Sequence, residues 1–289
     1  MIQWYILALV SAVFSAAAAI SQKKVLFKEK VLIFTTILGL FNLILVIPFF
    51  VSSDFTLLTS KGLFILFIKS ILEAGAFLCI MAGIKNLEIS KALPLLVLTP
   101  GIVAVLAFIF LGETLTPLEI SGMLLLIAGT YILETKEKII DSTKKVINSK
   151  GRKYILIALG LMVIKSLLDK TLLKNLGMPV DSFMAFQHLF LAVIFLTVVI
   201  LLGKSKEIKP TLKNSWPIIS LIAVFTIAYR FTEFSAIKDA PVALVLSLKR
   251  ISVFLAVLIG GKLFKERYLL KRIIATLIMI AGALLIING

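Results

Sequence analysis

Ten long apolar runs follow one another along the chain, and they decide what it can fold into. Each run has 17 to 23 residues, and an α-helix of that length can cross the roughly 30 Å hydrocarbon core of a bilayer. Lipid cannot hydrogen-bond to the backbone, so such runs are expected to be helical. The sequence therefore predicts an all-α polytopic membrane protein with ten transmembrane helices, at residues 2–20, 31–51, 62–84, 92–111, 117–133, 153–171, 182–202, 215–237, 240–260 and 268–287.

The composition supports this class and excludes others. Hydrophobic residues make up 60% of the 289, and the mean hydropathy is +1.11, against about 45–50% apolar residues in a soluble domain. The net charge of +16 comes mostly from short loops, where the anionic partner is the lipid bilayer surface rather than nucleic acid. Cys79 and His188 are the single cysteine and histidine, so we expect no disulfide framework, no metal site and no cofactor.

The first apolar run could be a cleaved signal peptide or a retained span. It contains the small-residue run Ala16–Ala19, as a signal peptide would. However, no Lys or Arg precedes the run, whereas Lys23 and Lys24 follow it directly. We therefore expect a retained first span.

Two matching halves flank a basic connection. A shift of 153 residues takes Glu113 to Glu266 and Gly129 to Gly282. Each half holds five spans, an odd number, so the second half must be inverted relative to the first. Inverted repeats are typical of alternating-access transporters. We expect a first five-helix repeat at 1–134, a basic linker at 135–152 and a second five-helix repeat at 153–289.

Small residues mark one face of the last span in each half. Gly122 and Gly129 are seven residues apart, as are Ala275 and Gly282, and this spacing predicts that the two helices pack closely. In the fourth span, Pro94, Pro100 and Gly101 predict a bend with freed carbonyl groups.

Loop charge predicts the orientation. Of the 26 Lys and Arg residues in the loops and at the span ends, 22 lie on one side, and the other side has Lys61, Lys170, Lys174 and Lys238. Positively charged loops favour the cytoplasm. We therefore expect a multi-pass protein of the cell membrane with its linker in the cytoplasm and both termini outside.

Lys249 and Arg250 lie near the middle of the apolar run 240–260. A cation at that depth costs from about 2.5 to above about 10 kcal/mol, so it needs a partner or a wet cavity. Snorkelling is the alternative, although both residues lie deep for it. We expect Arg250 to bind a substrate anion, because its planar guanidinium can bind a carboxylate or phosphate through two hydrogen bonds. We expect Lys249 to pair with an acid such as Glu73 or Glu233.

Further ionisable residues lie inside the spans as spaced pairs. Lys69 and Glu73 are four apart and either neutralise each other or form a coupling or substrate site; Glu73 could also reach Lys249 or Arg250. Arg230 and Glu233 repeat this spacing beside Tyr229, which offers a hydroxyl. Lys165 and Asp169 are expected to form an internal pair near the membrane boundary. Within the spans, five cations face three acids. The predicted substrate-binding residues are Lys249, Arg250, Arg230, Glu233, Tyr229, Glu73, Lys69, His188, Gln187 and Asn42.

Two segments of the sequence resemble the paired signature motifs of a transporter family. Phe110-Leu-Gly-Glu113-Thr-Leu-Thr-Pro and Leu263-Phe-Lys-Glu266-Arg are similar to those of EamA-type drug/metabolite transporters, and the resemblance covers nearly the whole chain. It implies a carrier of small metabolites; relatives include amino-acid exporters and nucleotide-sugar and sugar-phosphate translocators. Lys249-Arg250 resembles the Lys-Arg pair of the last group. The two signature glutamates lie at the interface, where we expect them to fix loops rather than contact substrate.

The function expected from these features is secondary transport by alternating access. A surplus of two cations within the spans favours an anionic or zwitterionic small-molecule substrate, with a proton or an exchanged metabolite as the coupling species. No GxxxxGK[ST] loop is present, which argues against ATP-driven transport by this chain alone. The alternative is an intramembrane lipid-modifying enzyme, but the sequence lacks a clustered acid, His or Ser–His constellation for it. A monomer or a homodimer is expected.

Overall fold

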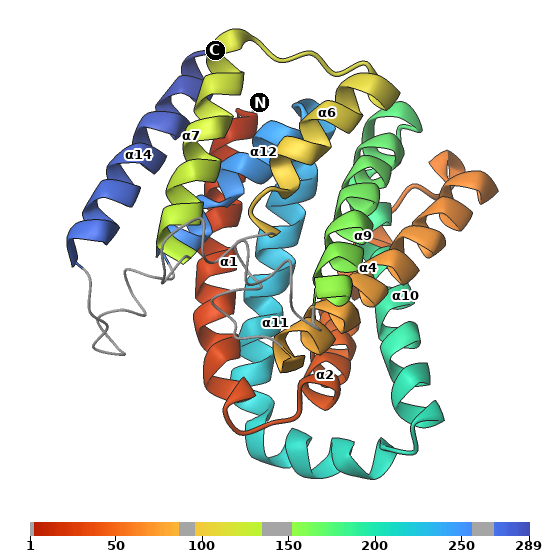
Figure 1. Cartoon of the computed structure of the whole chain (residues 1–289). Coiled ribbons are helices and arrows are strands. Elements are labelled where there is room, and N and C mark those ends of the chain that lie inside the picture. The colour runs from red at the N-terminus through yellow and green to blue at the C-terminus, as the bar shows by residue number, and fades with distance from the viewer. Residues whose placement is uncertain (1–2, 87–95, 135–151, 256–268) are drawn as a thin grey trace.

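The computed structural model describes residues 3–86, 96–134, 152–255 and 269–289, which form a bundle of helices (Figure 1). Within these residues every regular element is helical, so the predicted all-α class is confirmed. The main helices are α1 (Trp4–Leu26), α2 (Val31–Leu45), α3 (Ile47–Ser52), α4 (Ser60–Asn86), α6 (Thr99–Leu111), α7 (Pro117–Glu134), α9 (Arg152–Lys170), α10 (Val180–Leu201), α11 (Ile208–Asp239), α12 (Val242–Lys249) and α14 (Leu269–Asn288). Three single turns complete them: η1 (Phe55–Leu57), the π-helical η2 (Thr171–Asn175) and η3 (Ser205–Glu207).

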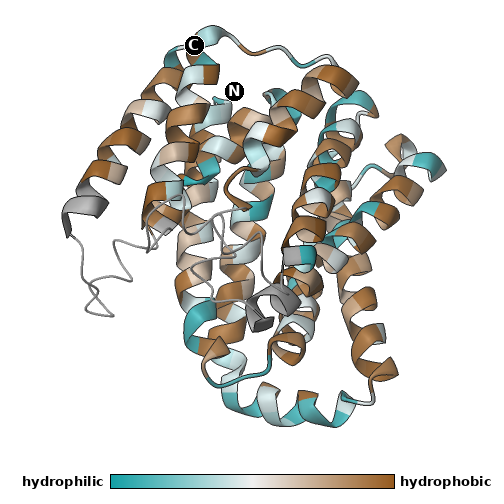
Figure 2. Cartoon of the chain, viewed as in Figure 1, coloured by the Kyte–Doolittle hydropathy of each residue, from teal (hydrophilic) through white to brown (hydrophobic). Residues whose placement is uncertain are grey.

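Four helical segments of the described chain are long and apolar enough to cross a membrane, namely Trp4–Leu26, Ser60–Ile80, Val180–Leu201 and Ser205–Asp239. Four shorter apolar helices accompany them at Val31–Leu45, Thr99–Leu111, Pro117–Leu133 and Ile274–Asn288. Hydrophobic residues predominate along most of the helices (Figure 2), and side chains such as Phe108, Phe110 and Leu277 are mostly exposed. An apolar exterior of this kind is expected of a protein surrounded by lipid.

Two of the predicted spans are broken rather than continuous. The span predicted at 31–51 is divided at Val46 into α2 and α3. The cause is Pro48, which has no backbone N–H and whose ring would clash with the carbonyl of Ile44. The span predicted at 240–260 is interrupted too, because α12 ends at Lys249 and Arg250 forms a turn before helix resumes at Ile251. The Lys-Arg pair therefore lies at a helix break.

The helix predicted at 215–237 begins earlier in the structure. α11 starts at Ile208 and contains Pro217. Its first turns run across the end of the bundle before the helix turns into the interior (Figure 1). A bend at an internal proline is expected, because proline removes one hydrogen bond of the helix.

The helices of the two predicted halves pack against one another. The most extensive contacts join α1 with α11, α4 with α9 and α7 with α14, and α2 also packs on α10 and α6 on α12. Both termini lie at the same end of the bundle (Figure 1). This arrangement brings the charged faces of α4, α9 and α11 together in the interior.

Close packing of the small residues on α7 and α14 is confirmed. A Cβ atom built on Gly122 would lie 2.6 Å from the Gly282 carbonyl oxygen, and one built on Gly129 would lie 3.0 Å from the Ala275 carbonyl oxygen. Backbone atoms cannot rotate out of the way as side chains can. The two helices therefore approach this closely only because these positions carry small residues.

We expect Gly122→Leu to lower the melting temperature of the protein in detergent, because the new side chain would force α7 away from α14. Overpacking of this kind typically costs about 1–3 kcal/mol. The matched control is Gly160→Leu on α9, where a built Cβ atom has no neighbour within 4 Å. Equal melting temperatures for the two variants would show that the α7–α14 contact is not tight.

Candidate functional site

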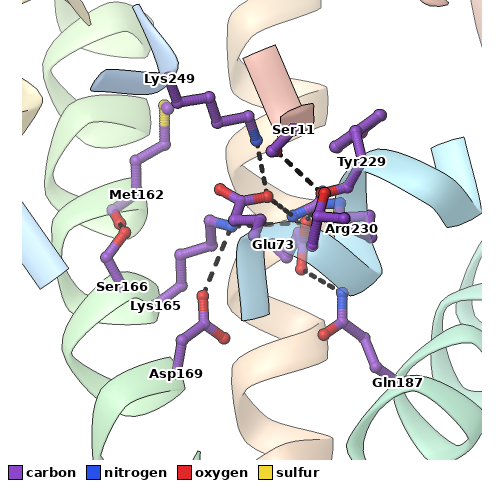
Figure 3. A network of polar contacts seen from close by, with 12 residues as sticks. Ser11, Glu73, Met162, Lys165, Ser166, Asp169, Gln187, Tyr229, Arg230 and Lys249 are labelled. Carbon is purple, nitrogen blue, oxygen red and sulfur yellow. Dashed lines mark hydrogen bonds and ion pairs between the residues drawn. The ribbon is translucent and has the colours of Figure 1, made fainter. Parts of the chain in front are cut away.

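Seven charged side chains from four helices meet in the interior of the described bundle. Figure 3 labels five of them, Glu73, Lys165, Asp169, Arg230 and Lys249. Ion pairs with nitrogen–oxygen distances below 4 Å connect them into one network. Four cations face three acids in it, so pairing offsets most of the cost of placing charge inside a membrane. The members are Lys69 and Glu73 of α4, Lys165 and Asp169 of α9, Arg230 and Glu233 of α11, and Lys249 at the end of α12.

Lys69 is the completely buried centre of this network. Its ammonium nitrogen lies 2.8 Å from a Glu73 oxygen, 2.9 Å from an Asp169 oxygen and 2.8 Å from the Gln187 side-chain oxygen. The rings of Phe183 and Phe234 lie 5.1 and 5.3 Å away and enclose it further. Because the Lys69 side chain is 0% exposed and surrounded by these groups, a substrate cannot contact it in this structure.

Glu73 is the acid that joins the largest number of partners. Besides Lys69, it accepts a hydrogen bond from Arg230 of α11, and its other neighbours are Lys165 at 3.5 Å and the Gln187 amide nitrogen at 3.3 Å. Of the two acids expected to pair with Lys249, Glu233 is the one that the structure places beside it, at 2.6 Å. Arg230 of α11 and Lys165 of α9 both contact Glu73, so the Lys69–Glu73 pair is not closed on itself.

Lys165 and Asp169 also belong to this network. They were predicted to form a separate pair near the membrane boundary, and that prediction is corrected here. Their mutual distance is 3.8 Å, whereas Asp169 lies 2.9 Å from Lys69 and Lys165 lies 3.5 Å from Glu73. The reason is that α9 packs along the length of α4. Their spacing of four residues inside an apolar run was the signal that could have assigned them, since it matches the spacing of Lys69 and Glu73.

The second half of the network surrounds Glu233. Its carboxylate accepts a 2.6 Å hydrogen bond from Lys249 and lies 3.8 Å from Arg230. The ring of Tyr229 faces the same cations, 4.6 Å from the Lys249 nitrogen and 5.4 Å from the Arg230 guanidinium carbon. Ser11 of α1 donates a 2.9 Å hydrogen bond to the Tyr229 backbone carbonyl (Figure 3). Tyr229 therefore contributes its aromatic face to the site, in cation–π geometry.

Exposure divides the network into a sealed part and an open part. The side chains of Lys69, Asp169 and Glu233 are 0–4% exposed. By contrast, those of Glu73, Lys165, Arg230 and Lys249 are 12–20% exposed. Since these four residues lie inside the bundle, this accessible surface indicates where a small molecule could reach the charges.

Arg250 lies beside the network at the break between α12 and the residues that follow. Its guanidinium donates a 2.7 Å hydrogen bond to the backbone carbonyl of Leu96. Leu96 precedes the turn Val97–Leu98 and the start of α6 at Thr99. The shift of 153 residues relates Leu96 to Lys249, so Arg250 connects the residues before α6 with the equivalent residues at the end of α12.

His188 and Asn42 lie outside this network. Both are nearly completely buried, on the packed helices α10 and α2. Neither His188 Nε2 nor Asn42 Oδ1 has a hydrogen-bond partner among the described residues. Gln187, one residue before His188, instead joins the network through Lys69 and Glu73.

Glu113 fixes a loop at the end of the bundle that holds the termini. One carboxylate oxygen accepts a 3.0 Å hydrogen bond from the Val242 N–H at the start of α12, and the other lies 3.3 Å from the Lys170 ammonium. Lys170 was counted among the loop cations, but the structure places it in the interior, where it is 2% exposed. Its ammonium donates to two carbonyl oxygens around the end of α11, at 2.6 and 2.7 Å, and both charged residues line a pocket of about 270 Å³. The equivalent Glu266 lies outside the described residues.

Comparison with known proteins gives a family and a fold. A model of the EamA-like transporter family matches residues 2–135 and 150–288. Among solved structures, 29 chains match. One of them, titled only as the crystal structure of a protein, has a TM-score of 0.75 and 14% identity, covering 98% of this chain and 96% of its own. At this identity the likeness shows the fold alone. A search of curated proteins found no match.

Proposed function

The chain belongs to the EamA-like transporter family, and we propose that it is a secondary transporter that carries a small anionic or zwitterionic metabolite across the cell membrane by alternating access. The observation that carries the proposal is the interior charge network. The network as a whole joins four helices, while Lys165, Arg230 and Lys249 keep accessible surface. Cations that are inside a membrane bundle and still accessible provide a binding site for an anion on its way through.

The pairing of helices supports two inverted repeats of five helices each. In this assignment α1 and α9 are the first helices of the repeats, and α4 and α11 are the third. A two-fold axis that exchanges the repeats then converts the α1–α11 contact into the α4–α9 contact. The contacts α2–α10, α6–α12 and α7–α14 each join equivalent helices, so the same axis leaves them unchanged. A two-fold axis in the membrane plane is the relation expected for inverted repeats, with the substrate site between them.

Arg230 is the best-placed residue to bind the substrate anion. It shares Glu73 with Lys69 at 2.8 Å and Lys165 at 3.5 Å. An arriving carboxylate or phosphate can therefore engage the guanidinium while Glu73 keeps two cations. Lys249 is less free to move, because it is the nearest cation to the buried Glu233.

Arg250 provides a connection between binding and conformational change. The carbonyl of Leu96 that it binds belongs to the other repeat. A substrate anion binds a guanidinium more strongly than a neutral carbonyl does. We propose that the anion competes for Arg250 and so releases this link between the repeats when the site fills.

The acids and the buried polar residues complete the proposed site. Glu73 and Glu233 balance the cations and could hold the amine of a zwitterion, and Glu73 is the candidate for proton coupling. Tyr229 supplies an aromatic wall. Lys69 and Gln187, together with His188 and Asn42, are assigned as supports rather than contacts, because all four are buried.

We expect purified protein in detergent to be stabilised against thermal unfolding by one class among carboxylates, phosphorylated acids and amino acids. Saturating ligand at about 100 times its Kd adds about 2.7 kcal/mol, which a melting curve resolves. Stabilisation confined to cationic amines would contradict the proposal. An intramembrane lipid-modifying enzyme, the alternative, would instead convert added lipid into a product that mass spectrometry detects.

A further inference from the structure

The end of the bundle opposite the termini is rich in lysine. Four lysines lie between residues 23 and 30, and four more lie between residues 204 and 213. The first set joins α1 to α2 and the second leads into α11. Hydrophilic residues gather at this end of the molecule (Figure 2). The charge is therefore concentrated on one surface.

The α1–α2 connection is fixed on α11 by both of the acids in these segments. Glu29 accepts 2.8 Å hydrogen bonds from the hydroxyl groups of Thr211 and Ser215. Glu207 pairs with Lys30 at 2.8 Å. These contacts occupy the acids and hold the connection in place, so the surface between α1 and α11 has a defined shape.

A pocket of about 800 Å³ lies between these elements, and we call it the lysine pocket. Its polar lining residues are Lys24, Lys28, Glu29, Asn214 and Ser215, and its apolar ones are Val25, Phe27 and Ile218. The Glu29 carboxylate is already hydrogen-bonded to Thr211 and Ser215. In the part of the chain that the structure describes, neither of the two lysines makes an ion pair. The pocket is thus cationic and amphipathic at once.

Aromatic residues indicate the depth of this pocket in the membrane. Phe27, in its lining, is 72% exposed, and Trp216, next to the lining residue Ser215, is 54% exposed. Exposed aromatic side chains of this kind are typical of the interface between hydrocarbon and water. The lysine pocket therefore lies at the level of the lipid headgroups.

We propose that the lysine pocket binds the headgroup of an anionic phospholipid. Lys24 and Lys28 face the phosphodiester, Asn214 offers an amide to the polar headgroup, and Phe27 and Ile218 contact the start of an acyl chain. A soluble phosphate would use the lysines and leave the apolar part of the lining unused, so the composition of the pocket favours an amphiphile. By loop charge this end faces the cytoplasm, where the leaflet carries the anionic lipids.

The test is titration of short-chain phosphatidylglycerol into the full-length protein in neutral detergent, followed by native mass spectrometry of the complex. The pocket variant is Lys24→Gln/Lys28→Gln, and the control is Lys204→Gln/Lys206→Gln, which removes two exposed lysines at the same end. We expect the pocket variant to bind about 25-fold more weakly, at about fivefold for each cation lost. The control should stay within about twofold of wild type, because its charges lie outside the pocket.

Three results would overturn the proposal: equal losses in both variants, wild-type binding of phosphatidylcholine as tight as that of phosphatidylglycerol, or displacement of the lipid by an equal concentration of inorganic phosphate. The last would identify a soluble anion as the occupant. If the glutamine variant does not fold, Lys24→Arg/Lys28→Arg keeps the charge and is expected to keep the affinity. Loss of affinity in that folded arginine variant would also contradict the proposal. None of these outcomes depends on transport.

Discussion

Replacing Lys69 by methionine is expected to destabilise the protein by about 3–5 kcal/mol, because it would leave an acid buried without its closest cation. Lys69 is completely buried and lies 2.9 Å from Asp169. The remaining cation near Asp169 is Lys165, at 3.8 Å. The free energy of unfolding, measured by denaturant titration in mixed micelles, should show the loss even if substrate binding survives.

The control for this prediction is Lys61→Met on the same helix. Lys61 is exposed at the start of α4, so its loss should change the stability little. Adding Asp169→Asn to Lys69→Met should restore part of the stability, because it removes the stranded charge. Equal stabilities of Lys69→Met and Lys61→Met would show that the network does not hold the helices together.

Replacing Arg230 by glutamine is expected to weaken substrate binding by about 100-fold or more. Two hydrogen bonds from a guanidinium to an anion contribute about 1.5–3 kcal/mol each. The melting temperature should change far less than in Lys69→Met, since Glu73 keeps Lys69 and Lys165 within 3.5 Å. Arg230→Lys should give an intermediate affinity, because a single ammonium cannot reproduce the two-pronged geometry.

Titration calorimetry with a ligand identified by thermal shift would check this prediction, and Lys174→Gln is the matched control. Lys174 is an exposed cation on the π-helical turn after α9, so its removal should leave the affinity unchanged. If Arg230→Gln binds the ligand as tightly as wild type while Arg250→Lys binds it more weakly, the substrate anion binds at Arg250, at the helix break, and not at Arg230.

Properties set by short segments could be predicted from the sequence. The helical class follows from the lengths of the apolar runs. Lys69 and Glu73 meet because residues four apart lie on one face of a helix. Close packing at Gly122 and Gly282 follows from the repeated spacing of small residues. Each of these predictions used only residues that are close along one helix, or the comparison of two equivalent helices.

Contacts between helices could not be predicted in the same way. Glu73 and Arg230 are 157 residues apart, and nothing in either segment indicates that α4 and α11 bring them together. The burial of Lys170 depends on carbonyl groups at the end of α11, which the pattern of apolar runs does not show. The break at Arg250 has no proline beside it, so the apolar run 240–260 does not indicate it.

Uptake into proteoliposomes tests the proposed transport most directly. The ligand identified by thermal shift is supplied in labelled form outside vesicles that contain unlabelled ligand, and a proton gradient is applied in a parallel sample. We expect saturable uptake by wild-type protein in one of these two conditions, and uptake reduced at least about 100-fold, at low ligand concentration, in Arg230→Gln. Ligand that binds the wild type but does not accumulate in either condition, or uptake by Arg230→Gln equal to wild type, would contradict a transporter whose anion site is the interior charge network.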